Sequence, residues 1–243
     1  MLLNIGNTHT QWVLADEKGH FSCAVQTLAT AQWQKDIAAL PSVEHDCVVW
    51  GACVVPWARQ KLDESNFYKN LHWVNADNAS RCGIDFSRVD TSTLGADRIA
   101  NAAALLEYDL PAANFDCGTA VTMEVMLDCG IFAGGAILPG RKLMRCSLSQ
   151  GTAALPELPL SNTLPDELGV NTLQALALGI DRGAVGMVRE LMHTAENYGV
   201  RKFLASGGDA GFFCQAIPEL SLAGSDFTLR GVYRIAAAYC GIV

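Results

Sequence analysis

The chain has 243 residues, of which 50% are hydrophobic and 17% are charged, so it can bury a large core and extended disorder is not expected. A net charge of -8 and an isoelectric point near 5.0 argue against a nucleic-acid partner, which requires a basic surface. No apolar run approaches the roughly 20 residues of a membrane span, and no signal peptide is recognisable, so we expect a cytoplasmic protein without a membrane partner.

Nine cysteines are scattered along the chain without a C-x-x-C pair. Their odd number and irregular spacing favour neither a zinc site nor a redox motif. Most have apolar sequence neighbours, as Cys47 has in Val48 and Val49. We therefore expect them to be small core residues of a protein in a reducing compartment.

The first part of the chain is predicted to form strands joined by tight turns, followed by a helix. Strands are expected at 1–4, 10–15 and 21–25. Thr30 is a plausible N-cap of the helix, which Pro41 ends. Further elements predicted before residue 110 are strands at 47–52 and 71–74 and helices at 56–64 and 94–107.

The pattern restarts near residue 111. Strands are predicted at 113–116, 121–127, 131–137 and 202–205, and helices at roughly 140–155, 171–197, from about 210 and at 228–240. Asn4 to Thr8 and Asp116 to Ala120 occupy the same place in two strand meanders, 112 residues apart. This spacing is too long for a solenoid and indicates a duplicated α/β domain, with domains at 1–110 and 111–243 around one cleft.

Each meander contains a glycine turn between two strands. Glycine lets the backbone approach an anion closely, and a neighbouring hydroxyl adds a donor. An acid at the strand end can hold a hydrated Mg²⁺ that bridges phosphates. Ordinary hairpins use the same residues, but two such turns at matched positions favour phosphate binding.

A third glycine element, Ser206-Gly207-Gly208-Asp209, lies between a predicted strand and a predicted helix. Such a connection can place a nucleotide against the start of a helix, or it can be a tight turn without a ligand. The chain contains neither a P-loop nor a dinucleotide-binding glycine motif. Any nucleotide would therefore be bound in another way.

Two charged residues, Asp97 and Arg98, stand at the start of the alanine-rich helix, after Gly95. Asp97 could accept a proton from a substrate hydroxyl, and Arg98 could pair with a substrate carboxylate. The structural alternative is an acid favoured at a helix start beside a surface arginine. The basic cluster of Arg141, Lys142 and Arg145 is interpreted as a solvated helix face.

Eight motifs follow one another in an order that resembles the type III pantothenate kinase family along almost the entire chain. They are Asn4-Ile5-Gly6-Asn7-Thr8, Gly95-Ala96-Asp97-Arg98, Asp116-Cys117-Gly118-Thr119-Ala120, Gly134-Gly135-Ala136-Ile137-Leu138-Pro139-Gly140, Ala154-Leu155-Pro156, Asn171-Thr172-x-x-Ala175-x-x-x-Gly179, Ser206-Gly207-Gly208 and Leu229-Arg230-Gly231. One short motif can match by chance, but eight in the same order are very improbable.

The resemblance implies a fold of duplicated RNase H-like, actin-like ATPase domains, each a mixed β-sheet flanked by helices, with a cleft between them. It also implies phosphorylation of pantothenate by ATP to 4'-phosphopantothenate, the first step of coenzyme A biosynthesis. Mg²⁺ and a monovalent cation, K⁺ or NH₄⁺, would be required. The partners implied are pantothenate, ATP and a second copy of the chain in a homodimer.

The resemblance also implies roles for individual residues. Asp97 would be the general base and Asp116 the metal-associated carboxylate. Pantothenate would be bound by Gly95, Ala96, Arg98 and, from the partner subunit, Thr172. ATP and its phosphates would be bound by Asn4, Gly6, Asn7, Thr8, Gly118, Thr119, Gly207 and Gly208.

The chain departs from the family pattern at two places. The family has aspartate where this chain has Asn4, so a negative charge beside Mg²⁺ is missing. Losing one charge-assisted contact costs on the order of 1.5–3 kcal/mol. Thr91 and Ser92 stand where relatives commonly have a proline, which concerns the shape of the pantothenate pocket.

The alternative hypotheses are a non-catalytic relative that binds nucleotide or pantothenate as a regulator, and a kinase for another small hydroxy acid.

Overall fold

A computed structural model describes residues 1–242 of the chain, which divide into two compact units. The first unit comprises residues 1–109, 128–133 and 226–242, and the second comprises 110–127 and 134–225. The units are thus discontinuous in the chain, whereas the sequence pattern predicted two continuous domains divided at residue 110. The last helix belongs to the first unit.

The first unit is built on a mixed five-stranded sheet. Its strands are β1 (Leu2–Ile5), β2 (His9–Val13), β3 (Gln26–Ala29), β4 (Val48–Cys53) and β5 (Asn70–Trp73), in the order β3-β2-β1-β4-β5. β2 is antiparallel to β1 and β3, whereas β4 is parallel to β1 and β5. Its helices are α1 (Thr30–Lys35), α2 (Pro56–Ser65), α3 (Ala76–Ser80), α4 (Ala96–Leu105) and α8 (Phe227–Cys240), with short 3₁₀ helices at Ile37–Ala39 and Thr91–Thr93.

The second sheet repeats this strand order. Its strands are β6 (Ala112–Cys117), β7 (Ala120–Leu127), β8 (Ile131–Pro139), β9 (Lys202–Ser206) and β10 (Leu220–Leu222), in the order β8-β7-β6-β9-β10. β7 is antiparallel to β6, and β9 is parallel to β6 and β10. The helices of this unit are α5 (Arg141–Gly151), α6 (Thr172–Glu196) and α7 (Ala210–Ala216). A 3₁₀ turn at Asp128–Gly130, which belongs to the first unit, precedes β8. The predicted duplication of mixed sheets flanked by helices is therefore confirmed.

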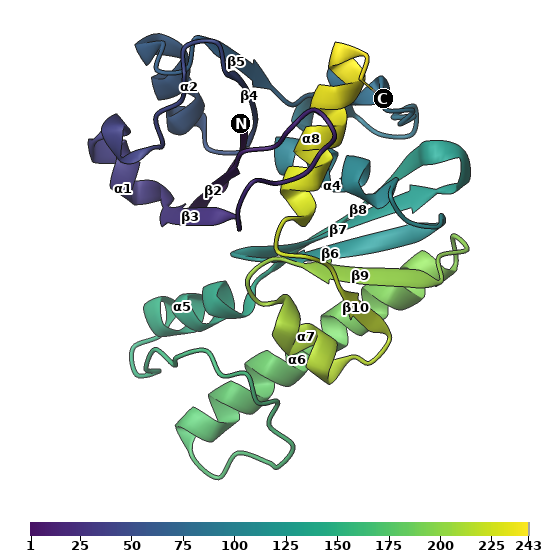
Figure 1. The fold of residues 1–243 in the computed structure, drawn as a ribbon. Helices are drawn as coiled ribbons and strands as arrows, with labels where there is room; N and C mark the ends of the chain where they lie inside the picture. Colours follow the sequence, from purple (N-terminus) through teal and green to yellow (C-terminus); the bar gives the residue numbers. More distant parts are fainter. Residues whose placement is uncertain (243) are drawn as a thin grey trace. The chain divides into compact units, whose positions relative to one another are not determined.

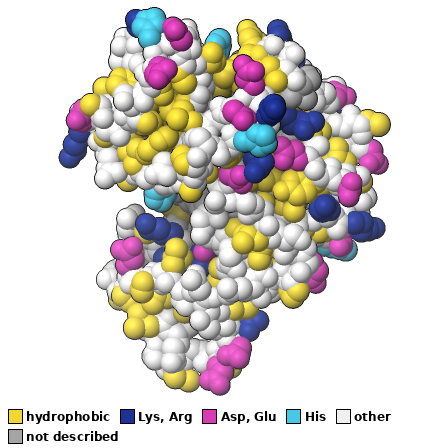
Figure 2. Space-filling model, viewed as in Figure 1, with side chains coloured by type: hydrophobic (Ala, Val, Ile, Leu, Met, Phe, Trp, Pro, Cys, Tyr) yellow, Lys and Arg dark blue, Asp and Glu magenta, His cyan; other side chains and the backbone are white. Residues whose placement is uncertain are grey.

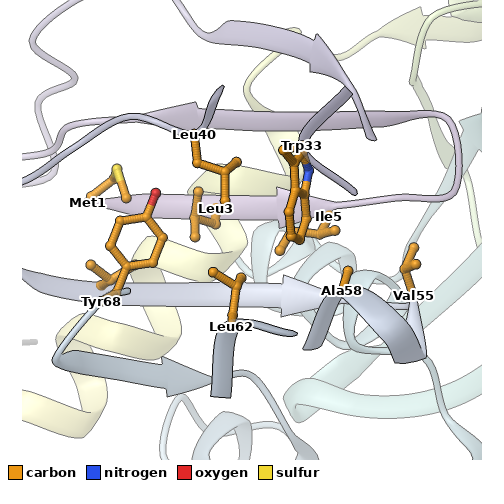
Figure 3. Close-up of a cluster of buried hydrophobic side chains, with 10 residues drawn as sticks. Met1, Leu3, Ile5, Trp33, Leu40, Val55, Ala58, Leu62 and Tyr68 are labelled. Carbon is orange, nitrogen blue, oxygen red and sulfur yellow. The ribbon is translucent and has the colours of Figure 1, made fainter. Parts of the chain in front are cut away.

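One face of the first sheet packs against α1 and α2. Because successive strand residues point to opposite faces, Leu3 and Ile5 of β1 both point toward these helices. They meet Trp33 of α1 and Leu62 of α2 in a cluster that is almost completely buried (Figure 3). At about 25 cal/mol per Å² of buried apolar surface, such clusters are the main favourable term in folding.

Helices α4 and α8 pack closely against each other within the first unit (Figure 1). Gly231 of α8 permits this approach, since a Cβ atom there would lie 1.8 Å from the carbonyl oxygen of Ala100 in α4. The Thr228 hydroxyl donates a hydrogen bond to Asn101 Oδ1 at 2.8 Å, and both side chains are buried. The backbone contact and the polar contact together fix the helix that carries Asp97.

The third predicted strand, at 21–25, is wrong. The strand lies at Gln26–Ala29, and Phe21 makes only an isolated bridge to Ala15. The preceding loop is held by Asp16, whose carboxylate accepts hydrogen bonds from the backbone N–H groups of Lys18 and His20. These side-chain hydrogen bonds favour a loop over a strand, although residues 21–25 include the apolar side chains on which the prediction depended.

The first helix also differs from its prediction. Its N-cap is Ala29, so Thr30 is the first helical residue, and the helix ends at Lys35 before a separate 3₁₀ turn. The Thr30 hydroxyl instead donates to the carbonyl oxygen of Gly6. The short helix α3 and the strand β10 were not predicted, because neither is long enough to show a period in the sequence.

The expectation that most cysteines are core residues is wrong. All nine are free, and of these only Cys117 is buried, whereas Cys23, Cys129 and Cys240 are exposed. The remaining five are partly buried. A cysteine next to apolar residues in the sequence is not necessarily buried, because adjacent residues of a strand point to opposite faces and those of a loop can point into solvent.

No helix within residues 1–242 has the length and apolar character needed to cross a membrane. Figure 2 shows acidic and basic side chains interspersed on the face in view, rather than basic groups gathered into a stripe.

Candidate functional site

The first glycine turn joins β1 to β2 and is anchored on α1. The N–H of Gly6 donates to the carbonyl oxygen of His9 at 3.0 Å, which closes the turn. Thr30 holds the turn from the helix, since its hydroxyl donates to Gly6 O at 2.7 Å and its N–H donates to Thr8 O at 2.9 Å. The side chains of Asn7 and Thr8 remain exposed at the tip, where they can contact a ligand.

Asn4 lies on β1, two residues before this turn. It pairs with Gln11 of β2 and with Ala52 of β4. Its amide Nδ2 donates to Gln11 Oε1 at 3.4 Å, and the side chain is partly buried. The position therefore holds a neutral amide pair at the point where the family pattern has a carboxylate.

Asp97 stands in the first turn of α4, which begins at Ala96 with Gly95 as its N-cap. A Cβ atom on Gly95 would lie 2.7 Å from Asp97 Oδ1, so glycine leaves space for the carboxylate. The N–H of Arg98 donates to the same oxygen at 2.7 Å. Burial nevertheless raises the pKa of Asp97 above its ordinary value, although the Arg98 N–H and the Arg98 charge act to lower it. A carboxylate with a raised pKa is a stronger base.

The second glycine turn joins β6 to β7 within the second unit. The N–H of Gly118 donates to Ala120 O at 2.9 Å, and Gly118 and Thr119 are exposed. Gly140, the N-cap of α5, packs directly on this turn, and its N–H donates to Thr119 O at 3.0 Å. A Cβ on Gly140 would lie 2.3 Å from Gly118 O, so only glycine allows this contact.

The third glycine element meets the same strand end. Gly207 has a φ of +87°, and a Cβ there would lie 2.5 Å from Asp116 Oδ1. The N–H of Asp209 donates to Cys117 O at 2.9 Å, and Asp116 pairs with Ser206 across β6 and β9. The structure thus brings Asp116, the turn at Gly118 and the turn at Gly207 together in the second unit, with Gly208 exposed beside them.

Asp116 suits a magnesium ion bound together with a nucleotide. Within residues 1–242 no group of three or more His, Cys, Asp or Glu side chains could hold a metal ion. Mg²⁺ at phosphoryl-transfer sites does not need such a group, because one or two carboxylates, waters and the substrate phosphates complete its six ligands. A partly buried carboxylate beside two glycine turns matches this requirement.

Thr172 is the first residue of α6 and is exposed. The preceding Asn171 is the N-cap, and its side chain accepts a hydrogen bond from the N–H of Gln174 at 3.0 Å. The start of the helix is therefore fixed by its N-cap, and the Thr172 side chain is accessible at the surface of its unit. The residues just before it, Leu168 and Val170, are exposed by 85% and 87%.

The interpretation of Arg141 and Arg145 as a solvated helix face is wrong. Both are buried, with 1% and 2% of their surface exposed. Arg141 donates to both carboxylate oxygens of Asp209, at 2.7 and 2.5 Å, and to Asp181 at 3.1 Å. Arg145 donates to both oxygens of Asp181, at 2.8 and 3.0 Å. Only Lys142 of the predicted cluster is exposed.

This buried ion network connects helices α5 and α6 of the second unit to the turn at Gly207 and Gly208. Asp209 follows Gly208 directly, Asp181 lies in the middle of α6, and the two arginines lie one turn apart in α5. The i, i+4 spacing of the two arginines, and an acid in the largely apolar first half of α6, were the available signal in the sequence. The pairing could not be predicted, because the partners are 36 to 68 residues apart.

Comparison with known proteins decides the family. The family model for type III pantothenate kinase matches residues 1–194, which include both glycine turns, the Asp97 motif and Thr172. The chain belongs to this family. The type III pantothenate kinase of Akkermansia muciniphila is 32% identical, over 98% of this chain and 97% of that protein.

Two solved structures have the same fold as this family member. A putative Baf family transcriptional activator from Campylobacter jejuni superposes with a TM-score of 0.65 at 20% identity, covering 96% of each chain. A putative 2-dehydro-3-deoxygalactonokinase from Sinorhizobium meliloti gives a TM-score of 0.60 at 11% identity, covering 99% of this chain and 98% of that one. At these identities the likeness concerns the fold alone, and it confirms the predicted fold class.

We expect Arg141→Met to destabilise the fold strongly, because it leaves the buried side of Asp209 without its partner. Breaking a buried ion pair from one side costs about 3–5 kcal/mol. The neighbouring Lys142→Met also removes one positive charge from α5, but from an exposed position, and should change the free energy of unfolding by no more than about 0.5 kcal/mol. Urea denaturation of the two variants measures the difference, and equal stabilities would contradict the structural role of the network.

Proposed function

We propose that this chain transfers the γ-phosphoryl group of ATP to the primary hydroxyl of pantothenate, giving 4'-phosphopantothenate and ADP. This is the first step of coenzyme A biosynthesis, and soluble substrates of this kind suit a cytoplasmic enzyme. The observation that carries the proposal is the Asp97 motif of the family, placed at the start of α4 with a carboxylate whose pKa is raised by burial. A protein that only binds nucleotide has no need for such a base.

The acceptor side of the reaction is assigned to the start of α4. The ionised Asp97 takes the proton of the pantothenate hydroxyl as that oxygen forms a bond to the γ-phosphorus. The bond from the γ-phosphorus to the bridging oxygen of ATP breaks, and ADP leaves with the electron pair. Arg98 pairs with the pantothenate carboxylate, and the backbone at Gly95 and Ala96 completes the contact.

The nucleotide side is assigned to the glycine turns. Asn7 and Thr8, together with the backbone at Gly6, bind phosphate oxygens, as do Gly118 and Thr119 in the second unit. Gly207 and Gly208 lie by the adenosine, and Asn4 contributes its amide. When bound with ATP, Mg²⁺ neutralises negative charge on the phosphates, and Asp116 would hold it. A monovalent cation, K⁺ or NH₄⁺, is assigned by family membership alone.

A homodimer is the third part of the proposal, with Thr172 contacting pantothenate bound to the partner subunit. Three apolar side chains surround Thr172 in sequence and are exposed, namely Leu168, Val170 and Leu173, the last by 50%. Single exposed apolar residues are ordinary on a monomer, but a group at one helix start is typical of an interface.

The second candidate function is a non-catalytic relative that binds the same ligands as a regulator. The observation that favours it is Asn4, which removes the negative charge that the family places at the end of β1. The first experiment therefore measures ADP release with ATP, Mg²⁺, K⁺ and pantothenate. Pantothenate-dependent release supports the kinase, and its absence in both the natural chain and the Asn4→Asp variant would refute it.

Asp97→Asn should lower the turnover number by about 10²–10⁴-fold while ATP binding is retained, since the hydroxyl proton loses its acceptor.

The natural enzyme should lose activity in acid with an apparent pKa above 3.8, because protonation of Asp97 removes the base. A raised pKa in the folded state also means that ionised Asp97 opposes folding at neutral pH, so the variant should not be less stable.

The exposed Glu107→Gln, two residues after the end of α4, is the charge-matched control and should retain activity. Initial rates across pH and equilibrium binding of ATP provide the two readouts. Loss of ATP binding in Asp97→Asn would argue against the assigned role.

Asn4→Asp should lower the Mg²⁺ concentration required for half-maximal activity by about ten- to a hundred-fold, because it adds one charge-assisted contact. Gln11→Glu is the matched control, since it adds the same charge to the residue that pairs with Asn4 on β2. A Mg²⁺ titration of the initial rate compares the three proteins. If Gln11→Glu had the same effect, the position of the charge would not matter and the assignment of Asn4 would fail.

Val170→Asp should shift the protein from dimer to monomer and reduce turnover, because it places a charge among apolar side chains buried by the partner. Leu222→Asp changes a similarly exposed apolar residue on β10 and should leave the dimer intact. Sedimentation velocity gives the oligomeric state. A natural chain that sediments as a monomer would remove the assignment of Thr172 to the partner's pantothenate.

A further inference from the structure

The first unit contains a cavity of about 400 Å³ at the β5 edge of its sheet. Its wall includes four aromatic rings and two guanidinium groups, from β4, β5, α2, α8 and the segment after α3. None of these side chains belongs to the residues assigned above to catalysis or nucleotide binding. A volume of this size is within the range of cavities that hold small organic ligands.

The cavity lies away from the glycine turn of the same unit. Trp50 of β4, which lines the cavity, pairs with Leu2 at the start of β1. The glycine turn follows Ile5, whose partner on β4 is Cys53. Three residues of strand separate these two positions, which corresponds to about 10 Å. A ligand in the cavity would therefore be distinct from one at the turn.

The inner wall is a stack of aromatic rings. Trp50 and His72 are stacked with centroids 4.9 Å apart and planes at 18°, and Tyr239 meets Trp50 edge-on at 5.2 Å. Trp50 is almost completely buried, and its indole Nε1 has no hydrogen-bond partner within residues 1–242. Tyr239, in contrast, is 42% exposed. The partly exposed rings of His72, Trp73 and Tyr239 offer flat surface to a ligand with a flat ring of its own, and Trp50 supports them from the buried side.

Two arginines, Arg59 and Arg81, line the cavity. The Arg81 guanidinium lies 4.4 Å from the centre of the Tyr239 ring, and within residues 1–242 no carboxylate forms an ion pair with it. Arg59 lies 5.5 Å from the Trp73 ring and approaches Asp63 only at 3.9 Å, with both side chains about half exposed. Against these two cations the lining contains one carboxylate, Asp77. Arg59 is thus balanced by Asp63, which also accepts a hydrogen bond from the Trp73 indole N–H at 2.7 Å, and Arg81 is the cation with which a ligand can pair.

We propose that this cavity binds a small aromatic carboxylate. The ring of the ligand would pack on the aromatic wall, and its carboxylate would pair with Arg81, whose planar guanidinium matches carboxylate geometry. An aliphatic anion would gain only the second interaction, and a neutral aromatic molecule only the first. Recognition therefore requires both features in one ligand.

Naphthoate is the probe, and its binding is measured by calorimetry and by the indole N–H signals of the protein in a ¹H–¹⁵N spectrum. The natural chain should show saturable binding, with Trp50 and Trp73 perturbed among the five tryptophans. Naphthamide, which lacks the charge, and decahydronaphthoate, which lacks the aromatic ring, should each bind at least about tenfold more weakly. Saturating ATP and pantothenate should not displace the probe.

Arg81→Gln should weaken naphthoate binding at least about tenfold, and Tyr239→Leu should do so independently. Both should keep the natural rate of ADP release and the natural circular dichroism spectrum, which shows that the fold is intact. Lys61→Gln, on the same helix as Arg59 but outside the cavity lining, is the charge control and should bind normally. The proposal is overturned if naphthoate fails to saturate the natural chain, if Arg81→Gln binds it unchanged, or if ATP displaces it.

Discussion

The parallel pairing of the first and fourth strand in each repeat is the constraint on which the candidate site depends. Parallel strands end at the same edge of a sheet, so the turns that follow them are brought together. In the second unit β6 and β9 end side by side, and Asp116 consequently lies against Gly207. In the first unit β1 and β4 do the same, since the N–H of Val54 donates to Ile5 O at 3.1 Å. The loop before α4 reaches the same edge, where a Cβ on Gly95 would lie 3.5 Å from Val54.

The local part of this arrangement could be predicted from the sequence. Short apolar runs broken by glycine indicate strands and turns, and matched turns 112 residues apart indicated the duplication. The motif order placed Asp97 at a helix start and Asp116 at a strand end, as observed. These features depend on neighbouring residues, which is why a single sequence contains them.

The features that the sequence did not reveal depend on residues far apart. Arg141 and Arg145 resembled an exposed basic cluster, because their carboxylate partners lie on other elements. The third strand was misplaced for a related reason, since β3 is selected by its pairing with β2 and not by its own apolar content. The burial of Cys117 alone among nine cysteines likewise follows from its position on the central strand β6. In each of these examples, contacts with residues distant in the sequence determined the burial of a side chain or the position of a strand.

The buried ion network is better explained by positioning than by stability. Two arginines and Asp181 lose nearly all contact with water, and well-packed apolar residues of similar volume would often be as stable or more stable. The bidentate contact between Arg141 and Asp209, however, fixes the orientation of the residue that follows Gly208, which an apolar contact could not do. On the other side of Arg141, its neighbour Gly140 packs on the turn at Gly118. A single arginine thus sets the spacing of the two glycine turns that face Asp116.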